Sequence, residues 1–136
     1  MVQSKLVFGE DERVAKWCQD RMPDFIGWSG YYVTIGREKY GQLNGGIVFT
    51  DYTRCNMTMA IVLEAPLNRP LLRAAFYYPF LQMKVRRVTA LVDVSNSDSR
   101  RLCEHAGFKQ EGILRDGAID GDVIVYGMTR QECRFI

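Results

Sequence analysis

The sequence predicts an α/β fold, a mixed sheet with helices in the order β-α-β-β-β-α-β-α-β-β. Three observations predict it. Two runs rich in apolar and β-branched residues, 57–63 and 88–94, suit central strands. An apolar stripe at helical spacing lies between them, which makes the two strands parallel neighbours. After the second run, a polar turn, a short helix ended by Gly107 and a further strand complete a strand–helix–strand unit.

The N-terminal third predicts a strand, a helix and a hairpin. The strand covers 6–8, and the helix follows three acidic residues and stops at Pro23. The hairpin joins strands 31–35 and 43–52 through a polar turn over 36–42. Gly45 and Gly46 interrupt the second hairpin strand, which indicates a bulge or a close approach of another backbone.

The second helix is predicted to have Asn68 or Arg69 as its N-cap, with Pro70 tolerated in the first turn because its missing N–H has no helical partner there. Its apolar stripe continues to Met83, and Pro79 in its interior predicts a kink.

Two strands close the chain. They cover 108–115 and 122–129, and the Asp-Gly pairs between them are hairpin signals. Residues 130–136 are expected to complete the last strand.

Composition narrows the class of protein. The 136 residues fit one domain, 1–136, and the chain is 47% hydrophobic and 25% charged with a net charge of +2. That charge does not argue for nucleic acid, and no run is long enough for a transmembrane helix. Four widely spaced cysteines and one histidine show no metal-ligand spacing. We therefore expect a reduced cytoplasmic protein that binds no nucleic acid, membrane or metal.

The polar residues converge at the ends of the two parallel strands. The first end runs from Glu64 to Arg73 and holds a helix N-terminus with two arginines. Free N–H groups and arginines favour an anion there. At the second end, Asn96 begins another helix. Carboxyl ends of parallel strands are the expected ligand site. The alternative is that Asn68 and Asn96 only cap helices and that the arginines are solvated.

A motif in the C-terminal half resembles a known family. Asn96, Ser99, Leu102, Cys103 and the run Ala106-Gly107-Phe108 are followed by Glu111-Gly112 and Arg115. This pattern resembles the signature of the GNAT superfamily of N-acetyltransferases. It is most similar to the branch that acetylates ribosomal-protein N-termini and to small single-domain members common in phage and prophage genomes. The resemblance covers about 57–133.

The resemblance implies an acetyl-CoA binder with the GNAT fold. In that family the fourth and fifth strands splay, and the pantetheine arm bonds to the backbone of the fourth strand. Here that backbone is near Leu63, Glu64 and Ala65, while Asn96 bonds the arm from the other side. The pyrophosphate rests on the N-terminus of the following helix, which here comprises Asn68, Arg69, Leu71, Leu72 and Arg73.

Two departures from the family are visible. The phosphate loop, 64–70, has two prolines and none of the family's glycines, so either the arginines compensate or binding is weak. Cys103 stands where many members place a tyrosine that protonates the leaving thiolate; a packed core cysteine is the alternative reading. Glu64 is the best candidate for a general base, with Asp51 and Tyr52 as weaker ones; a solvated strand-end carboxylate is the alternative for Glu64.

The expected function is transfer of an acetyl group from acetyl-CoA to an amine by direct attack in a ternary complex. The alternative is a non-catalytic GNAT-fold binding module whose phosphate loop has degenerated. The acceptor amine stays open among a protein N-terminus, a lysine, a polyamine and a small metabolite. The oligomeric state is also open, with a homodimer among the options.

Overall fold

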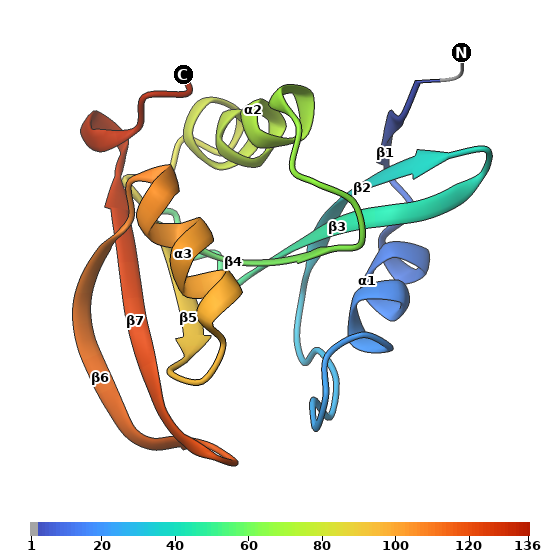
Figure 1. Ribbon diagram of the computed structural model, residues 1–136. Coiled ribbons are helices and arrows are strands. Elements are labelled where there is room, and N and C mark those ends of the chain that lie inside the picture. The colour runs from blue at the N-terminus through green and yellow to red at the C-terminus, as the bar shows by residue number, and fades with distance from the viewer. Residues whose placement is uncertain (1–2) are drawn as a thin grey trace.

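A computed structural model describes residues 3–136. They form a seven-stranded sheet of order β1-β2-β3-β4-β5-β7-β6, in which only β4 and β5 are parallel neighbours (Figure 1). The predicted order of elements and the parallel pair are confirmed. The elements are β1 (Lys5–Phe8), α1 (Asp11–Gln19), β2 (Val33–Lys39), β3 (Gln42–Thr50), β4 (Asn56–Leu63), α2 (Arg69–Tyr77), β5 (Arg87–Asp93), α3 (Ser97–Ala106), β6 (Lys109–Ala118) and β7 (Gly121–Thr129).

The helices cover both faces of the sheet. Figure 1 shows α2 and α3 on one face and α1 on the other. The main core lies under α2 and α3, where Phe76 packs beside Phe80, Phe108 and Phe135. A smaller core lies under α1, where Val14 and other small apolar residues pack against β3. We call these sides the α2 face and the α1 face.

Glycines let α1 approach the sheet closely. Gly36 of β2 and Gly46 of β3 pair directly opposite each other beneath the helix. A Cβ on Gly46 would come within 2.5 Å of the Cys18 sulfur, and one on Gly36 within 2.8 Å of Val14 Cγ2. The close approach predicted at Gly46 is therefore confirmed. The turn predicted over 36–42 begins too early, because Gly36 is a contact glycine inside β2 and not a turn glycine.

The hairpin turn itself is shorter than predicted. Tyr40 and Gly41 form it, both with positive φ, which is the geometry of a tight two-residue turn. The register of β2 and β3 shifts beside Arg37, so that Asn44 is an extra residue on β3.

The second helix changes its form at Pro79. α2 ends at Tyr77 and continues as a π-helical turn, Tyr78–Gln82, in which the Met83 N–H donates to the Tyr78 carbonyl. Proline has no N–H to donate, so the regular α ladder cannot pass through it. The disruption predicted at Pro79 is thus a π turn rather than a kinked α-helix.

The expected strand over 130–136 is wrong. β7 ends at Thr129, and Arg130–Glu132 forms a 3-10 turn. Glu132 Oε1 accepts hydrogen bonds from the Thr129 N–H and Oγ1, both at 2.9 Å. This capping box satisfies the backbone where a ladder would otherwise continue.

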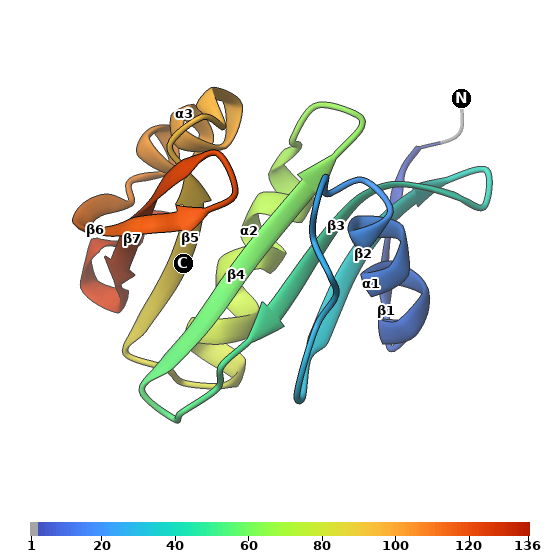
Figure 2. The ribbon, with the colours of Figure 1, turned by 90° about the horizontal axis from the view of Figure 1, so that it is seen from below.

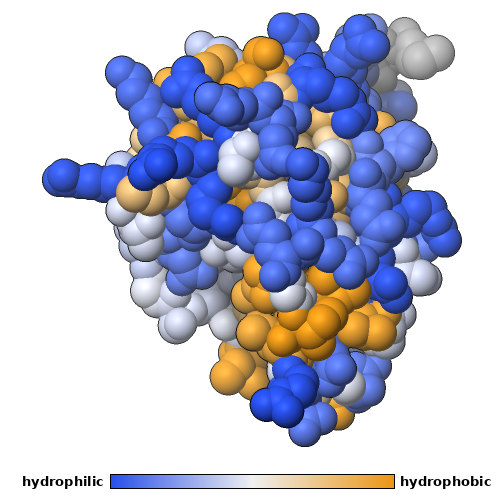
Figure 3. All heavy atoms as spheres, turned by 90° about the vertical axis from the view of Figure 1, so that its left-hand side faces the viewer, coloured by the Kyte–Doolittle hydropathy of each residue, from blue (hydrophilic) through white to orange (hydrophobic). Residues whose placement is uncertain are grey.

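The β6 end of the sheet is the most exposed. Every residue of β6 before Ala118 is solvent-exposed, including Ile113 and Leu114. Figure 3, which views the molecule from this side, shows apolar atoms gathered on the lower part of the face below a polar upper part. β6 pairs only with β7 in the described residues, so its outer edge has no strand partner there.

Candidate functional site

The central feature is the divergence of β4 and β5. The two strands pair only from Asn56 to Thr58 and from Arg87 to Thr89, and then separate (Figure 2). We call the region beyond this pairing, 59–63 and 90–93, the β4–β5 fork. On its other side, β4 stays paired with β3 along its length.

Within residues 3–136, the fork leaves one edge of β4 without a strand partner. The Glu64 N–H donates to the Asn44 carbonyl of β3, and the β3–β4 register is unbroken. In an antiparallel ladder the bonding direction alternates residue by residue. Met59, Ile61 and Leu63 therefore turn their N–H and C=O groups toward the fork. An extended chain with amide groups can pair with this edge as a strand would.

A polar network lies at the base of the fork on the α1 face, beside the residues where β4 and β5 still pair. The Thr89 hydroxyl donates to Asn56 Oδ1 at 2.6 Å and accepts from Arg87 Nε at 3.1 Å. Arg87 also forms an ion pair with Glu111 of β6 at 2.8 Å. These bonds tie β4, β5 and β6 together where pairing stops, which fixes the angle at which the strands separate.

Arg37 of β2 holds the loop between β4 and α2. It is 1% exposed and donates to the carbonyls of Ala65 and Pro66 at 2.9 and 2.8 Å, and to Asn44 Oδ1 at 2.7 Å. It makes no ion pair within residues 3–136. In a trans peptide the carbonyl and the following N–H point in opposite directions. The Leu67 N–H therefore points away from Arg37, outward from the loop.

The N-terminus of α2 has a side-chain cap and unused donors. Asn68 Oδ1 accepts from the Leu71 N–H at 3.1 Å, and its carbonyl accepts from the Leu72 N–H. The N–H groups of Leu67, Asn68 and Arg69 make no hydrogen bond within the described residues. Three donors at a helix N-terminus, with the Arg37 charge behind the loop, suit an anion.

The predicted phosphate-site residues are only partly brought together. Asn68 and Arg69 lie at the helix N-terminus, and Arg69 is exposed there. Leu71 is buried in the core, and Leu72 packs against it. Arg73 instead lines a hollow against β1 and β2, described below. Arg69 and Arg73 therefore do not converge on one anion, although the three N–H donors and Arg37 remain.

The other arm of the fork ends at α3. Asn96 caps this helix, since its Oδ1 accepts from the Ser99 N–H at 3.1 Å, and the side chain is exposed at the end of β5. Cys103 is partly buried against the main core. Burial, with a smaller contribution from the Glu104 carboxylate, raises the pKa of the Cys103 thiol to about 11. The thiol is therefore protonated at neutral pH.

Comparison with solved structures gives the fold. No protein-family model matches the chain, and no curated protein matches its sequence. A mutant of the spermidine N-acetyltransferase SpeG from Vibrio cholerae matches with a TM-score of 0.77 and 16% identity, covering 95% of each chain. The chain has the GNAT acetyltransferase fold.

Two further structures agree. The first is the spermidine/spermine N-acetyltransferase SpeG from Vibrio cholerae in complex with manganese ions. It matches with a TM-score of 0.73 and 16% identity over 93% of this chain and 92% of that one. A GNAT-family acetyltransferase from Bacillus anthracis matches with a TM-score of 0.62 and 22% identity over 73% and 67% of the two chains.

On this GNAT fold, Glu64 lies on the α1 face at the end of β4. Its Oε2 is 2.8 Å from Arg21 Nε, and the carboxylate remains about half exposed. Glu64, Arg21 and Trp17 line a polar hollow of about 530 Å³. The Arg21 guanidinium also stacks on Trp17, 4.1 Å from the ring centroid. The candidate base is thus held in place rather than freely solvated.

Sequence reasoning missed three of these residues. Arg37 carried only a weak signal, a basic residue that directly follows the apolar and β-branched run 31–35 and Gly36. Arg21 and Tyr126 carried none. Tyr126 is fully buried on β7 and donates to Glu104 Oε2 of α3 at 2.6 Å, which places a tyrosine hydroxyl against α3 from outside that helix.

Residues 3–136 contain no group of three or more His, Cys, Asp or Glu side chains placed to hold a metal ion. None of the helices in this part of the chain has the length and apolar character needed to cross a membrane.

Proposed function

We propose that this protein is an N-acetyltransferase that moves an acetyl group from acetyl-CoA to an amine. The observation that carries the proposal is the unpaired edge of β4 at Met59, Ile61 and Leu63, which leads directly to three unused N–H groups at the start of α2. A ligand with an amide-bearing arm and a pyrophosphate matches this order of groups. Acetyl-CoA is such a ligand.

The donor is bound mainly by backbone. Its pantetheine amides pair with the β4 edge, and Asn96 lies across the fork to meet the arm from β5. The pyrophosphate accepts from the N–H groups of Leu67, Asn68 and Arg69. The loop lacks the glycines that usually let a phosphate approach the backbone closely. Arg37 instead binds the loop carbonyls on the inner side, which leaves the loop N–H groups facing outward.

The acceptor approaches from the α1 face. α2 and α3 cover the opposite face, while α1 lies over β2 and β3 rather than over β4 and β5. The amine nitrogen attacks the thioester carbonyl, and a β4 N–H stabilises the oxyanion. The carbon–sulfur bond then breaks, and the thiolate takes a proton from Cys103 or solvent. Glu64 accepts the amine proton, directly or through water.

The acceptor is an amine, and the structurally similar proteins suggest which amines to test. Transfer in this geometry requires a neutral amine nitrogen. Structural neighbours are titled spermidine N-acetyltransferases, which puts a polyamine in the panel to be tested beside a protein N-terminal peptide and a lysine peptide. The ribosomal-protein branch, cytoplasmic location and a homodimer remain predictions from the sequence.

The decisive experiment combines binding with turnover. Acetyl-CoA at 100 times its dissociation constant is expected to stabilise the fold by about 2.7 kcal/mol, which thermal unfolding measures. Glu64→Gln is expected to keep this stabilisation while acetylation, followed by mass spectrometry over the amine panel, falls on the order of a hundredfold. Glu12→Gln, an exposed carboxylate on α1, is the matched control. If millimolar acetyl-CoA leaves the unfolding temperature unchanged, the proposal is wrong.

The second candidate function is a non-catalytic binding module on the same fold. The glycine-free loop and the ion pair that engages Glu64 favour it. Acetyl-CoA binding without transfer to any amine of the panel would support this candidate. Turnover that depends on Glu64 would exclude it.

A further inference from the structure

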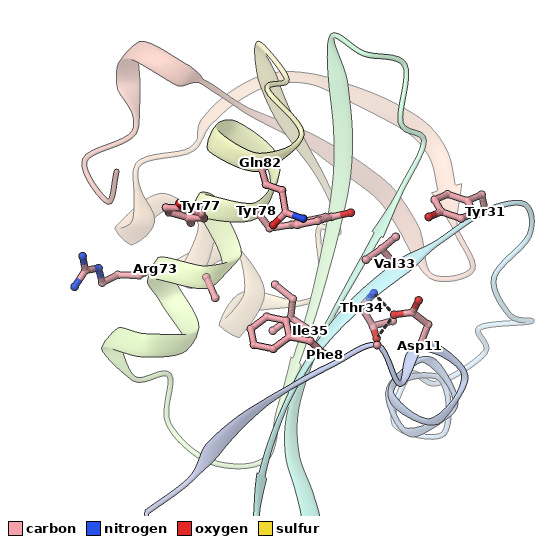
Figure 4. A pocket seen from close by; sticks show the side chains of 12 residues that line it. Phe8, Asp11, Tyr31, Val33, Thr34, Ile35, Arg73, Tyr77, Tyr78 and Gln82 are labelled. Carbon is pink, nitrogen blue, oxygen red and sulfur yellow. Dashed lines mark hydrogen bonds between the residues drawn. The ribbon is translucent and has the colours of Figure 1, made fainter.

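A second hollow lies away from the β4–β5 fork. It has a volume of about 610 Å³ and lies on the α2 face, between the C-terminal half of α2 with its π turn and the edge formed by β1 and β2 (Figure 4). β3 and β4 separate it from the fork. The acyl-transfer proposal makes no use of it.

Four aromatic side chains, Phe8, Tyr31, Tyr77 and Tyr78, line the hollow. Tyr31 and Phe8 are 76% and 62% exposed, so their rings meet water rather than packing in the core. Tyr78 lies opposite, fixed by its packing on Phe49 at a centroid distance of 5.1 Å. Figure 4 shows the hydroxyl groups of Tyr31 and Tyr78 pointing toward each other across the hollow, above Val33. The hydroxyls of Tyr31 and Tyr78 therefore face the same hollow, which the Phe8 ring also lines.

One carboxylate is built into this wall. Asp11 Oδ1 accepts from the Thr34 N–H at 2.8 Å and from Thr34 Oγ1 at 2.9 Å, which fixes the side chain at the start of α1. Its second oxygen accepts no hydrogen bond within residues 3–136, and Asp11 is one of the residues that line the hollow. Asp11 also forms no ion pair among the described residues.

Asp11 gives the wall of the hollow one carboxylate. Burial is the main cause that raises the pKa of Tyr78, with a smaller contribution from Asp11, so the Tyr78 hydroxyl is neutral. Arg73 lines the rim with its aliphatic stem, and Figure 4 shows its guanidinium pointing away from the hollow. Asp11 is therefore the charged group that a ligand would meet inside.

We propose that this hollow is a binding site for an organic ammonium ion with an apolar body. The faces of tyrosine and phenylalanine attract a cation electrostatically. The fixed oxygen of Asp11 accepts a charge-assisted hydrogen bond from an ammonium N–H. The aliphatic side chains of Val33, Ile35 and Ala74 take the apolar body. A neutral or anionic ligand of the same shape gains only the last of these contributions.

The site is tested on the full chain with three four-carbon ligands, butylammonium, 1-butanol and butyrate. Titrations are followed through the backbone amide signals of Val33 and Thr34 in NMR spectra at fixed ionic strength. Butylammonium is expected to bind on the order of tenfold more tightly than 1-butanol, and butyrate more weakly still.

Variants locate the charge that binds. Asp11→Asn keeps an oxygen acceptor for Thr34 and is expected to weaken butylammonium on the order of tenfold, while Glu12→Gln leaves its affinity unchanged. Tyr31→Ala, at a position too exposed to disturb folding, is expected to weaken it severalfold. Equal affinity for butylammonium and 1-butanol would overturn the proposal. So would an affinity that neither Asp11→Asn nor Tyr31→Ala reduces.

Discussion

Replacement of Arg37 by methionine tests how the phosphate loop is held. Methionine keeps most of the side-chain volume but donates no hydrogen bond. Three acceptors then lose their donor: the carbonyls of Ala65 and Pro66 and the side-chain oxygen of Asn44. Water can reach the loop, because Pro66 is exposed, so each acceptor costs about 1 kcal/mol. We expect the free energy of unfolding to fall by about 3 kcal/mol.

Loss of this anchor also frees the loop before it binds a ligand. If two loop residues regain backbone freedom, ordering them again costs about 2 kcal/mol, which weakens CoA at least tenfold. Urea unfolding measures the first effect, and calorimetric titration with CoA measures the second. Arg86→Met is the matched control, since Arg86 is exposed and its side chain makes no hydrogen bond within residues 3–136. An Arg37→Met protein within about 0.5 kcal/mol of wild type, with unchanged CoA affinity, would refute the reasoning.

Three further predictions concern the rest of the fold. Gly46→Ala is expected to destabilise the protein by about 2 kcal/mol in urea unfolding, because its Cβ would collide with α1, whereas Gly112→Ala, which meets nothing within 4 Å, is expected to be neutral. The pKa of Glu132 is lowered to about 2 by Lys109 and by the capping box. The ionised Glu132 contributes its full stabilisation above its unfolded pKa, about 4.5, and this contribution is lost as the pH falls toward 2. The difference in unfolding temperature between wild type and Glu132→Gln should therefore stay constant from pH 5 to 7 and shrink between pH 4.5 and 2. Iodoacetamide at pH 7.5 should modify the exposed Cys55 much faster than Cys103, as peptide mass spectrometry would show; equal rates would contradict the burial of Cys103.

Local signals in the sequence were sufficient for the elements and their order. Alternating apolar residues identified β4 and β5, and the caps Asn68 and Asn96 both accept the hydrogen bonds expected of them. The prediction failed where the same residue type is compatible with two local structures. Gly36 signals a turn in sequence, yet its place under α1 is set by a helix that lies more than twenty residues earlier.

The candidate site was predictable only in part, for a related reason. The position of the anion-binding N–H groups follows from the strand end and the helix cap, which are local. The direction of Arg73, and the part played by Arg37, depend on contacts between distant segments. Nothing near 65–66 in the sequence shows that an arginine 28 or 29 residues earlier binds those carbonyls.

The contact between Arg37 and the loop ties ligand binding to the order of folding. The loop carbonyls acquire their partner only when the β2–β3 hairpin has joined β4, so the anion site is absent from any state in which the first half of the sheet is detached. Partial unfolding of β1–β3 should therefore abolish CoA binding while α3 and the β5–β7–β6 strands are still intact.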